Sequence, residues 1–140
     1  MGDLVVDTSV VVKWYLPERD NEAARALRDA YLEGEVDLVA PALLPFEAVN
    51  ALRYSGQFDG KQLAAAARSL SEYGIDLVPF GDAGPVADIA TDLDITVYDA
   101  AYVALAERLD TTAYTADETL LDDLSDEYDE RLAHIRTYSA

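Results

Sequence analysis

The chain has 140 residues, 51% of them hydrophobic, and a formal net charge of −18. This length predicts a single domain over residues 1–140, and the hydrophobic content excludes a disordered acidic tail. The absence of cysteine excludes disulfide bonds and thiolate metal sites and favours the cytoplasm. No apolar run approaches the roughly 18 residues of a membrane span, and no leader-like segment precedes Asp3, so we expect a soluble, unprocessed chain.

The spacing of apolar residues predicts strands that alternate with helices along the whole chain. Residues 4–6 are three apolar β-formers, typical of a strand buried on both faces of a parallel sheet, and residues 10–18 indicate a short helix or turn. Further strands are predicted over 36–40, 75–79, 112–115 and 132–136, helices over 20–32, 43–54, 61–73, 83–93, 99–108 and shortly after 117, and a loop or extended piece over 94–98. This alternation predicts an α/β fold, with a parallel sheet of about five strands and helices on both faces.

Four acids stand at comparable places in this pattern. Asp7 follows the first strand, Glu47 lies on the helix after the second, Asp99 starts a helix, and Asp117 follows the fourth strand. In a parallel sheet all four can converge on the carboxyl edge, where open α/β sheets bind their ligands. Converging carboxylates repel one another unless they are protonated or bridged by cations. A hard divalent cation such as Mg²⁺ accepts oxygen ligands, whereas one histidine and no cysteine make zinc a poor fit.

Each acid also has a purely structural interpretation. Asp99, Asp117 and Asp7 are placed to cap the helices that follow them, as Asp20 is expected to cap the helix over 20–32. Glu47 is harder to explain in this way, because a lone acid on an apolar helix is usually buried only with a partner. Asn50 lies one turn after Glu47 on the same face.

Four segments carry a family resemblance: Asp7–Glu18, Pro41–Leu52, Val97–Glu107 and Thr115–Leu120. In the expected order and over nearly the whole chain, they resemble the PIN-domain ribonucleases, and most closely the VapC-type toxins of VapBC toxin–antitoxin pairs. The resemblance implies a three-layer α/β/α sandwich and metal-dependent endonucleolytic cleavage of RNA that leaves 5′-phosphate and 3′-hydroxyl ends. It also implies a homodimer and a small VapB-like antitoxin, for which the helices around residues 23–32 and 64–70 are plausible contact surfaces.

The resemblance also assigns residues. Asp7, Glu47, Asp99 and Asp117 match the acidic quartet of the family, expected to be catalytic and to hold one or two Mg²⁺ or Mn²⁺ ions. Thr115 matches the hydroxyl residue two positions before the last acid, and Asn50 the polar residue one turn after the glutamate. Thr8, Ser9 and Thr115 are expected to orient water or the metal ligands. Such a site would promote in-line attack of water on a phosphodiester.

The basic residues are few, and seven of the ten lie at or before Arg68. Lys13, Arg19 and Arg53 lie near the segments that bear the acids and are the candidates for RNA contacts. His134 is expected to be structural. Residues 71–140 hold 17 of the 28 acids and three bases, so we expect a salt-adapted, halophilic protein whose self-repulsion is screened in molar salt.

Other functions remain open at this point. A standalone RNA-processing PIN nuclease and a catalytically silent PIN fold that only binds a partner are the main alternatives. A response-regulator receiver would need a lysine after its last strands, and a haloacid-dehalogenase-like phosphatase would need an acid where Ser9 stands. A PIN protein with a cysteine-based zinc module is excluded by composition. The sequence does not indicate which RNA is cut.

Overall fold

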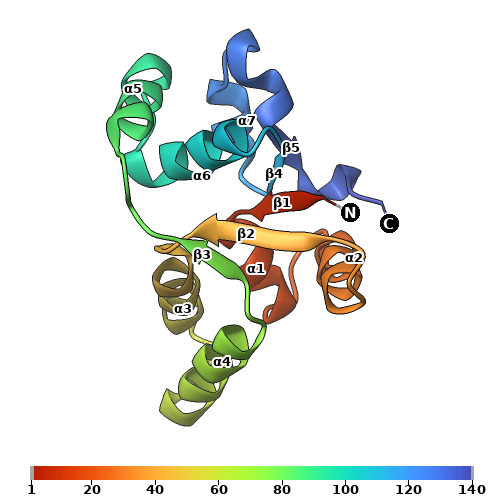
Figure 1. The fold of residues 1–140 in the computed structure, drawn as a ribbon. Helices are drawn as coiled ribbons and strands as arrows, with labels where there is room; N and C mark the ends of the chain where they lie inside the picture. Colours follow the sequence, from red (N-terminus) through yellow and green to blue (C-terminus); the bar gives the residue numbers. More distant parts are fainter. Residues whose placement is uncertain (1, 140) are drawn as a thin grey trace.

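The computed structural model describes residues 2–139, and a five-stranded, all-parallel sheet lies at its centre (Figure 1). The strands are β1 (Asp3–Val6), β2 (Asp37–Pro41), β3 (Asp76–Val78), β4 (Ala113–Thr115) and β5 (Leu132–His134). Their order in the sheet is β3-β2-β1-β4-β5, and Val5 pairs with both Val39 and Ala113. The predicted parallel sheet of about five strands is confirmed, with β1 in the middle and β5 at one edge.

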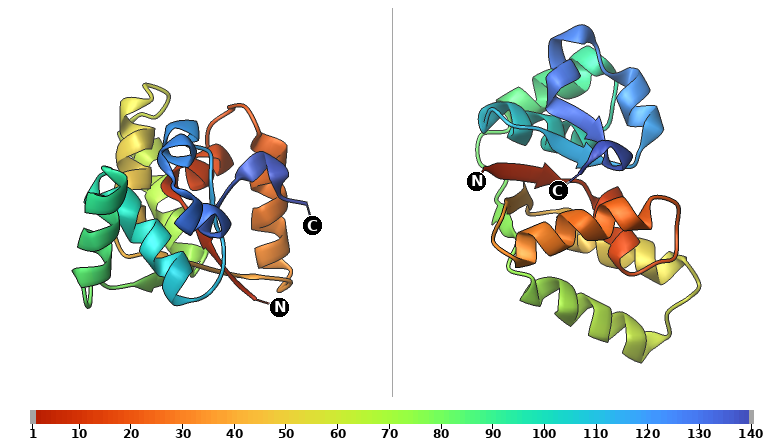
Figure 2. Two further views of the ribbon diagram at one scale, coloured as in Figure 1. Left: turned by 90° about the horizontal axis from the view of Figure 1, so that it is seen from above. Right: turned by 90° about the vertical axis from the view of Figure 1, so that its right-hand side faces the viewer.

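The helices lie on the two faces of this sheet. They are α1 (Thr8–Val11), α2 (Asn21–Leu32), α3 (Leu44–Tyr54), α4 (Gly60–Glu72), α5 (Gly84–Leu93), α6 (Val97–Arg108) and α7 (Glu118–Asp123), with 3-10 helices η1 (Val12–Trp14), η2 (Asp126–Arg131) and η3 (Ile135–Thr137). Figure 2 shows α2 and α4 on one side of β1 and α6 on the other. This arrangement is the predicted three-layer α/β/α sandwich. None of the helices within residues 2–139 has the length and apolarity to cross a membrane.

The core fills the space between the sheet and its two helical layers. Val5 and Val6 in β1 are fully buried, as expected for a central strand covered on both faces. On α6, five residues point inward: Ala100, Tyr102, Val103, Leu105 and Ala106. Burying a side chain of the size of valine or leucine stabilises the fold by about 1.5–3 kcal/mol. The packing therefore fixes β1 and α6, the two elements that lead into Asp7 and bear Asp99.

Two predicted helix starts are wrong in detail. Asp20 has a left-handed backbone (φ 65°) and its side chain makes no capping hydrogen bond to α2. The next residue fixes this turn instead, because the Asn21 side-chain amide donates to the carbonyls of Lys13 and Leu16 at 3.1 and 2.7 Å.

Helix α6 begins two residues before the predicted start at Asp99. Its N-cap is Thr96, whose Oγ1 accepts a hydrogen bond from the backbone N–H of Asp99 at 3.1 Å. The segment predicted as a loop over 94–98 is therefore helical from Val97 onward. Because Thr96 serves as the cap, the carboxylate of Asp99 is not used for capping.

Candidate active site

The four acids lie at the carboxyl edge of the sheet, around the point where the order of the strands reverses. Strand β1 leads to β2 on one side of the sheet, whereas its other neighbour, β4, leads to β5 on the opposite side. Such a switch point opens a crevice beyond the strand ends. Asp7 directly follows β1, and its backbone N–H donates to the carbonyl of Tyr114 in β4 at 3.0 Å. Asp117 lies two residues beyond β4, so the two aspartates flank this crevice.

Asp7 is buried, with 6% of its surface exposed. The hydrogen bonds that its carboxylate accepts all go to the same oxygen, Oδ2. Oδ2 accepts hydrogen bonds from the Ser9 hydroxyl at 2.5 Å, the Thr115 hydroxyl at 2.9 Å and the Ser9 backbone N–H at 3.3 Å. Burial raises the pKa of Asp7 and the charge of Glu47 raises it further, while the hydrogen bonds from Ser9 and Thr115 oppose the increase. Oδ1 is thus the oxygen of Asp7 left for a ligand.

The same two hydroxyls join the turn after β1 to the turn after β4. Ser9 Oγ accepts the backbone N–H of Ala116 at 2.8 Å, and Thr115 Oγ1 accepts that of Asp117 at 3.1 Å. Each hydroxyl therefore donates its proton to Asp7 and accepts a hydrogen bond from a backbone N–H of the turn after β4. The structure thus places Ser9 and Thr115 in contact with Asp7.

Glu47, in the first turn of α3, is held by two hydroxyl groups. Its Oε1 accepts hydrogen bonds from Thr8 Oγ1 and from the Tyr102 hydroxyl, both at 2.9 Å, and these two oxygens lie 2.8 Å apart. Tyr102 is 1% exposed and comes from the buried face of α6. Burial raises the pKa of Tyr102, and the charges of Asp7 and Glu47 raise it further, so the phenol remains a donor.

Tyr102 is a site residue that sequence reasoning did not single out. It lies one helical turn after Asp99, so the helical repeat puts the two side chains on neighbouring parts of one face. That spacing was the available signal. The spacing is not distinctive, because α6 is apolar on most of its surface and a tyrosine on such a helix is expected to be a core residue.

Asp99 and Asp117 complete the group and are half-buried. Partial burial raises the pKa of Asp99, followed by the charges of Asp7 and Asp117. Asp117 does cap α7, because its Oδ1 accepts the backbone N–H of Leu120 at 3.1 Å. Asp7 likewise caps α1 through the Ser9 N–H. The capping interpretation is therefore true of both residues, and it leaves the second carboxylate oxygen of each for a ligand.

The donor set suits a hard divalent cation, although the side chains do not form a finished cage. Carboxylate oxygens are the ligands that Mg²⁺ and Mn²⁺ prefer. The acids act on one another electrostatically, as the raised pKa values of Asp7 and Asp99 show. Within residues 2–139, however, no three acidic or histidine side chains converge closely enough to hold an ion as they stand. Some of these acidic side chains would therefore have to move toward a bound cation.

The candidate RNA-contact residues differ in exposure. Lys13 is buried, with 8% of its surface exposed, and its ammonium lies 3.6 Å from Glu18 Oε1. Arg19 and Arg53 are exposed, and the Arg53 guanidinium lies 4.8 Å from the centre of the Tyr54 ring. Asn50 is exposed one turn after Glu47.

The histidine lies apart from the acid group. His134 is buried at the end of β5, and its Nδ1 accepts the backbone N–H of Arg136 at 3.1 Å.

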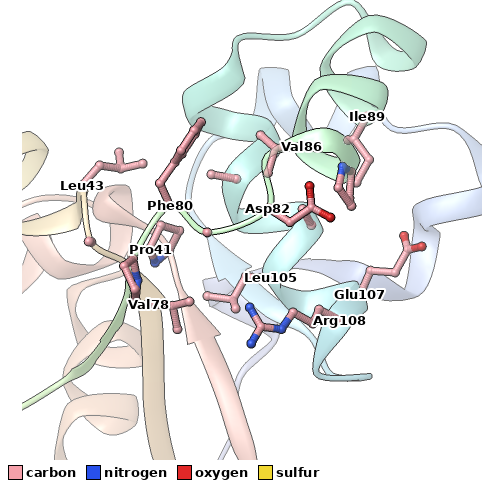
Figure 3. A pocket seen from close by; sticks show the side chains of 16 residues that line it. Pro41, Leu43, Val78, Phe80, Asp82, Val86, Ile89, Leu105, Glu107 and Arg108 are labelled. Atoms are coloured by element: carbon pink, nitrogen blue, oxygen red, sulfur yellow. The ribbon is translucent and has the colours of Figure 1, made fainter.

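The structure also has a separate apolar groove of about 860 Å³ (Figure 3). Its lining side chains come from the ends of β2 and β3, the loop after β3, α5 and α6. Among them are the exposed Phe80 and three charged residues, Asp82, Glu107 and Arg108. None of the four acids lines the groove, so its size does not identify the chemical centre. We assign the candidate site to the carboxylates at the switch point.

Comparison with known proteins agrees with this fold. The family model described as PIN domain matches residues 4–126. The structure of PAE2754 from Pyrobaculum aerophilum is similar at a TM-score of 0.69 and 23% identity, covering 96% of this chain and 90% of that one. FitAcB from Neisseria gonorrhoeae is similar at 0.64 and 21%, covering 96% and 99%. FitAB bound to an IR36 DNA fragment is similar at 0.64 and 19%, covering 98% of both chains. No curated protein gives a significant match.

Proposed function

Because this chain belongs to the PIN domain family, we propose that it is a metal-dependent endoribonuclease that hydrolyses RNA phosphodiester bonds. The observation that carries the proposal is the placement of Asp7, Glu47, Asp99 and Asp117 at one edge of the sheet, where the charges of other acids in this group contribute to raising the pKa values of Asp7 and Asp99. Perturbed carboxylates that gather in a crevice are typical of functional sites. We propose the whole chain as one PIN domain acting in the cytoplasm.

The roles of the residues follow from their hydrogen bonds. Asp7 Oδ1 and Asp99 would be the main ligands of one or two Mg²⁺ or Mn²⁺ ions, with Glu47 Oε2 and Asp117 completing the set. When bound, the metal stabilises negative charge on the attacking and leaving oxygens of the phosphodiester. Ser9 and Thr115 hold Asp7 by Oδ2 and keep its orientation fixed. Arg19 and Arg53 are exposed and remain the candidates for contacts with RNA phosphates.

We further propose that the protein is a VapC-type toxin, a homodimer neutralised by a cognate antitoxin. Support comes from the four sequence segments that resemble this group and from structural neighbours that include FitAB, which is bound to a DNA fragment in its structure. The net charge of −18 would favour an antitoxin with a basic segment. Co-expression with the product of a short neighbouring reading frame, followed by measurement of complex mass and RNA cleavage, tests this part. A standalone processing nuclease would remain active with that product present.

One observation favours a second candidate, a PIN fold that binds a partner without catalysis. Within the described residues the acids are not gathered into a ready cation cage. A silent binding module would keep the fold and the hydroxyl contacts to Asp7 but would have no metal-dependent activity.

A cleavage assay separates the two candidates. Purified protein would be incubated with RNA and Mn²⁺ or Mg²⁺, and the assay repeated with EDTA, with Asp7→Asn and with Asp99→Asn. We expect cleavage that requires the metal and falls at least about a hundredfold in both variants, the loss typical when a group that stabilises the transition state is removed. Asp122→Asn, an exposed acid of α7, is the matched control and should cleave normally. Cleavage that survives both site substitutions would reject the proposal.

A further inference from the structure

Two hydroxyl groups from different helices fix a single oxygen of Glu47. Thr8 Oγ1 from α1 and the Tyr102 hydroxyl from α6 both lie 2.9 Å from Glu47 Oε1, and 2.8 Å from each other. The three side chains are far apart in sequence and come together only in the folded sheet. A carboxylate oxygen that accepts two hydrogen bonds has little capacity left for a third strong ligand.

The supporting groups are themselves held rigidly. Tyr102 is almost fully buried on α6, between the fully buried Ala100 and Val103 and their neighbours. Thr8 is the first residue of α1, directly after the capping Asp7. Side chains anchored on packed helices can hold a ligand within the tolerance that a metal site requires, whereas a free glutamate samples many rotamers.

The same arrangement occurs at Asp7. There Ser9 and Thr115 donate to Oδ2, and Oδ1 is left over. The neighbours Thr8 and Ser9 thus hydrogen-bond to different acids, Thr8 to Glu47 and Ser9 to Asp7. Two carboxylates of the quartet are therefore each fastened by one oxygen through a pair of hydroxyls, a repetition that packing alone does not require.

We propose that Tyr102 and Thr8 are positioning residues that hold Glu47 by Oε1 and present Oε2 as its only ligand oxygen for a hard divalent cation. This inference rests on the proposed metal-dependent function. It assigns to Tyr102 a role in cation affinity rather than in packing alone. Outer hydrogen bonds to metal ligands of this kind typically account for about 10- to 100-fold in metal affinity or activity.

Direct measurement of Mn²⁺ binding tests the inference without relying on cleavage. The free Mn²⁺ signal in electron paramagnetic resonance would be titrated with wild type, Tyr102→Phe, Thr8→Val, Thr8→Ser and Glu47→Gln. We expect Tyr102→Phe and Thr8→Val to weaken binding about tenfold, and Thr8→Ser, which keeps the hydroxyl, to bind within about twofold of wild type. The control is Tyr31→Phe, which removes another tyrosine hydroxyl bond, from Tyr31 to the carbonyl of Tyr73 at 2.8 Å.

A double variant distinguishes positioning from general loosening of the fold. If Tyr102 acts through Glu47, then Tyr102→Phe added to Glu47→Gln causes no further loss of Mn²⁺ affinity. Additive losses, or Tyr102→Phe and Thr8→Val that both bind Mn²⁺ like wild type, would overturn the inference. If Tyr102→Phe does not fold, the contrast between Thr8→Val and Thr8→Ser decides the question.

The proposed function has a different failure signature. A wild type that neither binds Mn²⁺ nor cleaves RNA rejects the function itself, and with it the inference. A wild type that binds Mn²⁺ and loses cleavage in Asp7→Asn, but whose Mn²⁺ affinity does not change in Glu47→Gln, keeps the function and rejects only the role of Tyr102 and Thr8.

Discussion

Thr115 Oγ1 donates a hydrogen bond to Asp7 Oδ2 over 2.9 Å and so joins the ends of the neighbouring strands β1 and β4. Thr115 is fully buried and Asp7 nearly so. The same hydroxyl makes a second hydrogen bond, because Thr115 Oγ1 also accepts the backbone N–H of Asp117. The orientation of one acid of the quartet and the backbone position of another therefore depend on a single hydroxyl.

Thr115→Val keeps the shape of the side chain and removes this hydroxyl. We expect the free energy of unfolding to fall by about 1–3 kcal/mol, because Asp7 loses a donor and the N–H of Asp117 loses its acceptor in a buried place. Cleavage should fall as well, since Asp7 is less firmly oriented. Urea denaturation and the cleavage rate measure the two effects.

Thr115→Ser is the control for that variant, and it should recover most of both losses because it restores the donor and the acceptor. An unfolding free energy of Thr115→Val within about 0.5 kcal/mol of wild type would show that the hydroxyl is not needed for stability.

Asp7→Asn should abolish cleavage and yet stabilise the metal-free fold at neutral pH. Burial raises the pKa of Asp7, so the folded state holds this proton to a higher pH than the unfolded chain does. A group of this kind adds stability that is fully present below its unfolded pKa, at roughly 4, and is lost as the pH rises through the folded value. As the pH rises through the folded value, the metal-free wild type therefore acquires a buried charge that asparagine avoids.

Denaturation of both proteins in EDTA from pH 4 to pH 8 would measure this effect. The stability of Asp7→Asn relative to wild type should increase with pH, whereas the exposed control Asp122→Asn should follow wild type. A stability difference between Asp7→Asn and wild type that is independent of pH would contradict the assignment of a raised pKa to Asp7.

Divalent cations should stabilise the folded protein through the same carboxylates. Partial burial is the largest cause of the raised pKa of Asp99, and the negative charges of Asp7 and Asp117 raise it further. A bound cation would offset the repulsion among these charges. A cation present at a hundred times its Kd adds about 2.7 kcal/mol to the free energy of unfolding. Thermal unfolding with Mg²⁺ or Mn²⁺, against NaCl of equal ionic strength, should show the gain in wild type and lose most of it in Asp99→Asn. Equal gains in the two proteins would place the cation elsewhere.

The strand pattern and the positions of the four acids could be predicted because they depend on local signals. Residues 4–6 form an apolar run that ends at Asp7, and the alternation of strands and helices dictates the parallel sheet that gathers its carboxyl ends. The start of α6 was misplaced because threonine and aspartate are both good N-caps, and Thr96 and Asp99 lie three residues apart. Only the structure shows that Thr96 is the cap, because its side chain accepts the N–H of Asp99.

Contacts between distant side chains could not be predicted from one sequence. Thr8 and Ser9 are adjacent, yet one binds Glu47 and the other Asp7, because which acid each hydroxyl meets depends on where α3 and β4 lie. The sequence makes Lys13 a candidate for RNA contacts, and the structure adds that its side chain is largely buried and its ammonium pairs with Glu18. A lysine can extend its ammonium into solvent or bury its aliphatic stem against apolar residues, and only the fold determines which of the two occurs.

The stability of the protein should increase with salt. The chain has a net charge of −18, and six acids of α7, η2 and the segment between them are exposed within nine residues: Asp122, Asp123, Asp126, Glu127, Asp129 and Glu130. At 0.1 M salt the Debye length is about 10 Å, so these charges repel one another, whereas at 1 M it is about 3 Å and the repulsion is screened. We expect the Tm in 1 M KCl to exceed that in 0.1 M KCl by about 4 °C or more, which for a domain of this size corresponds to roughly 1 kcal/mol or more.

The quadruple variant Asp126→Asn, Glu127→Gln, Asp129→Asn, Glu130→Gln should show a smaller rise and a higher Tm at low salt, because it removes repulsion that salt would otherwise screen. A wild-type Tm that stays constant or falls between the two concentrations would contradict salt adaptation and leave the acidity of this surface without a screening role.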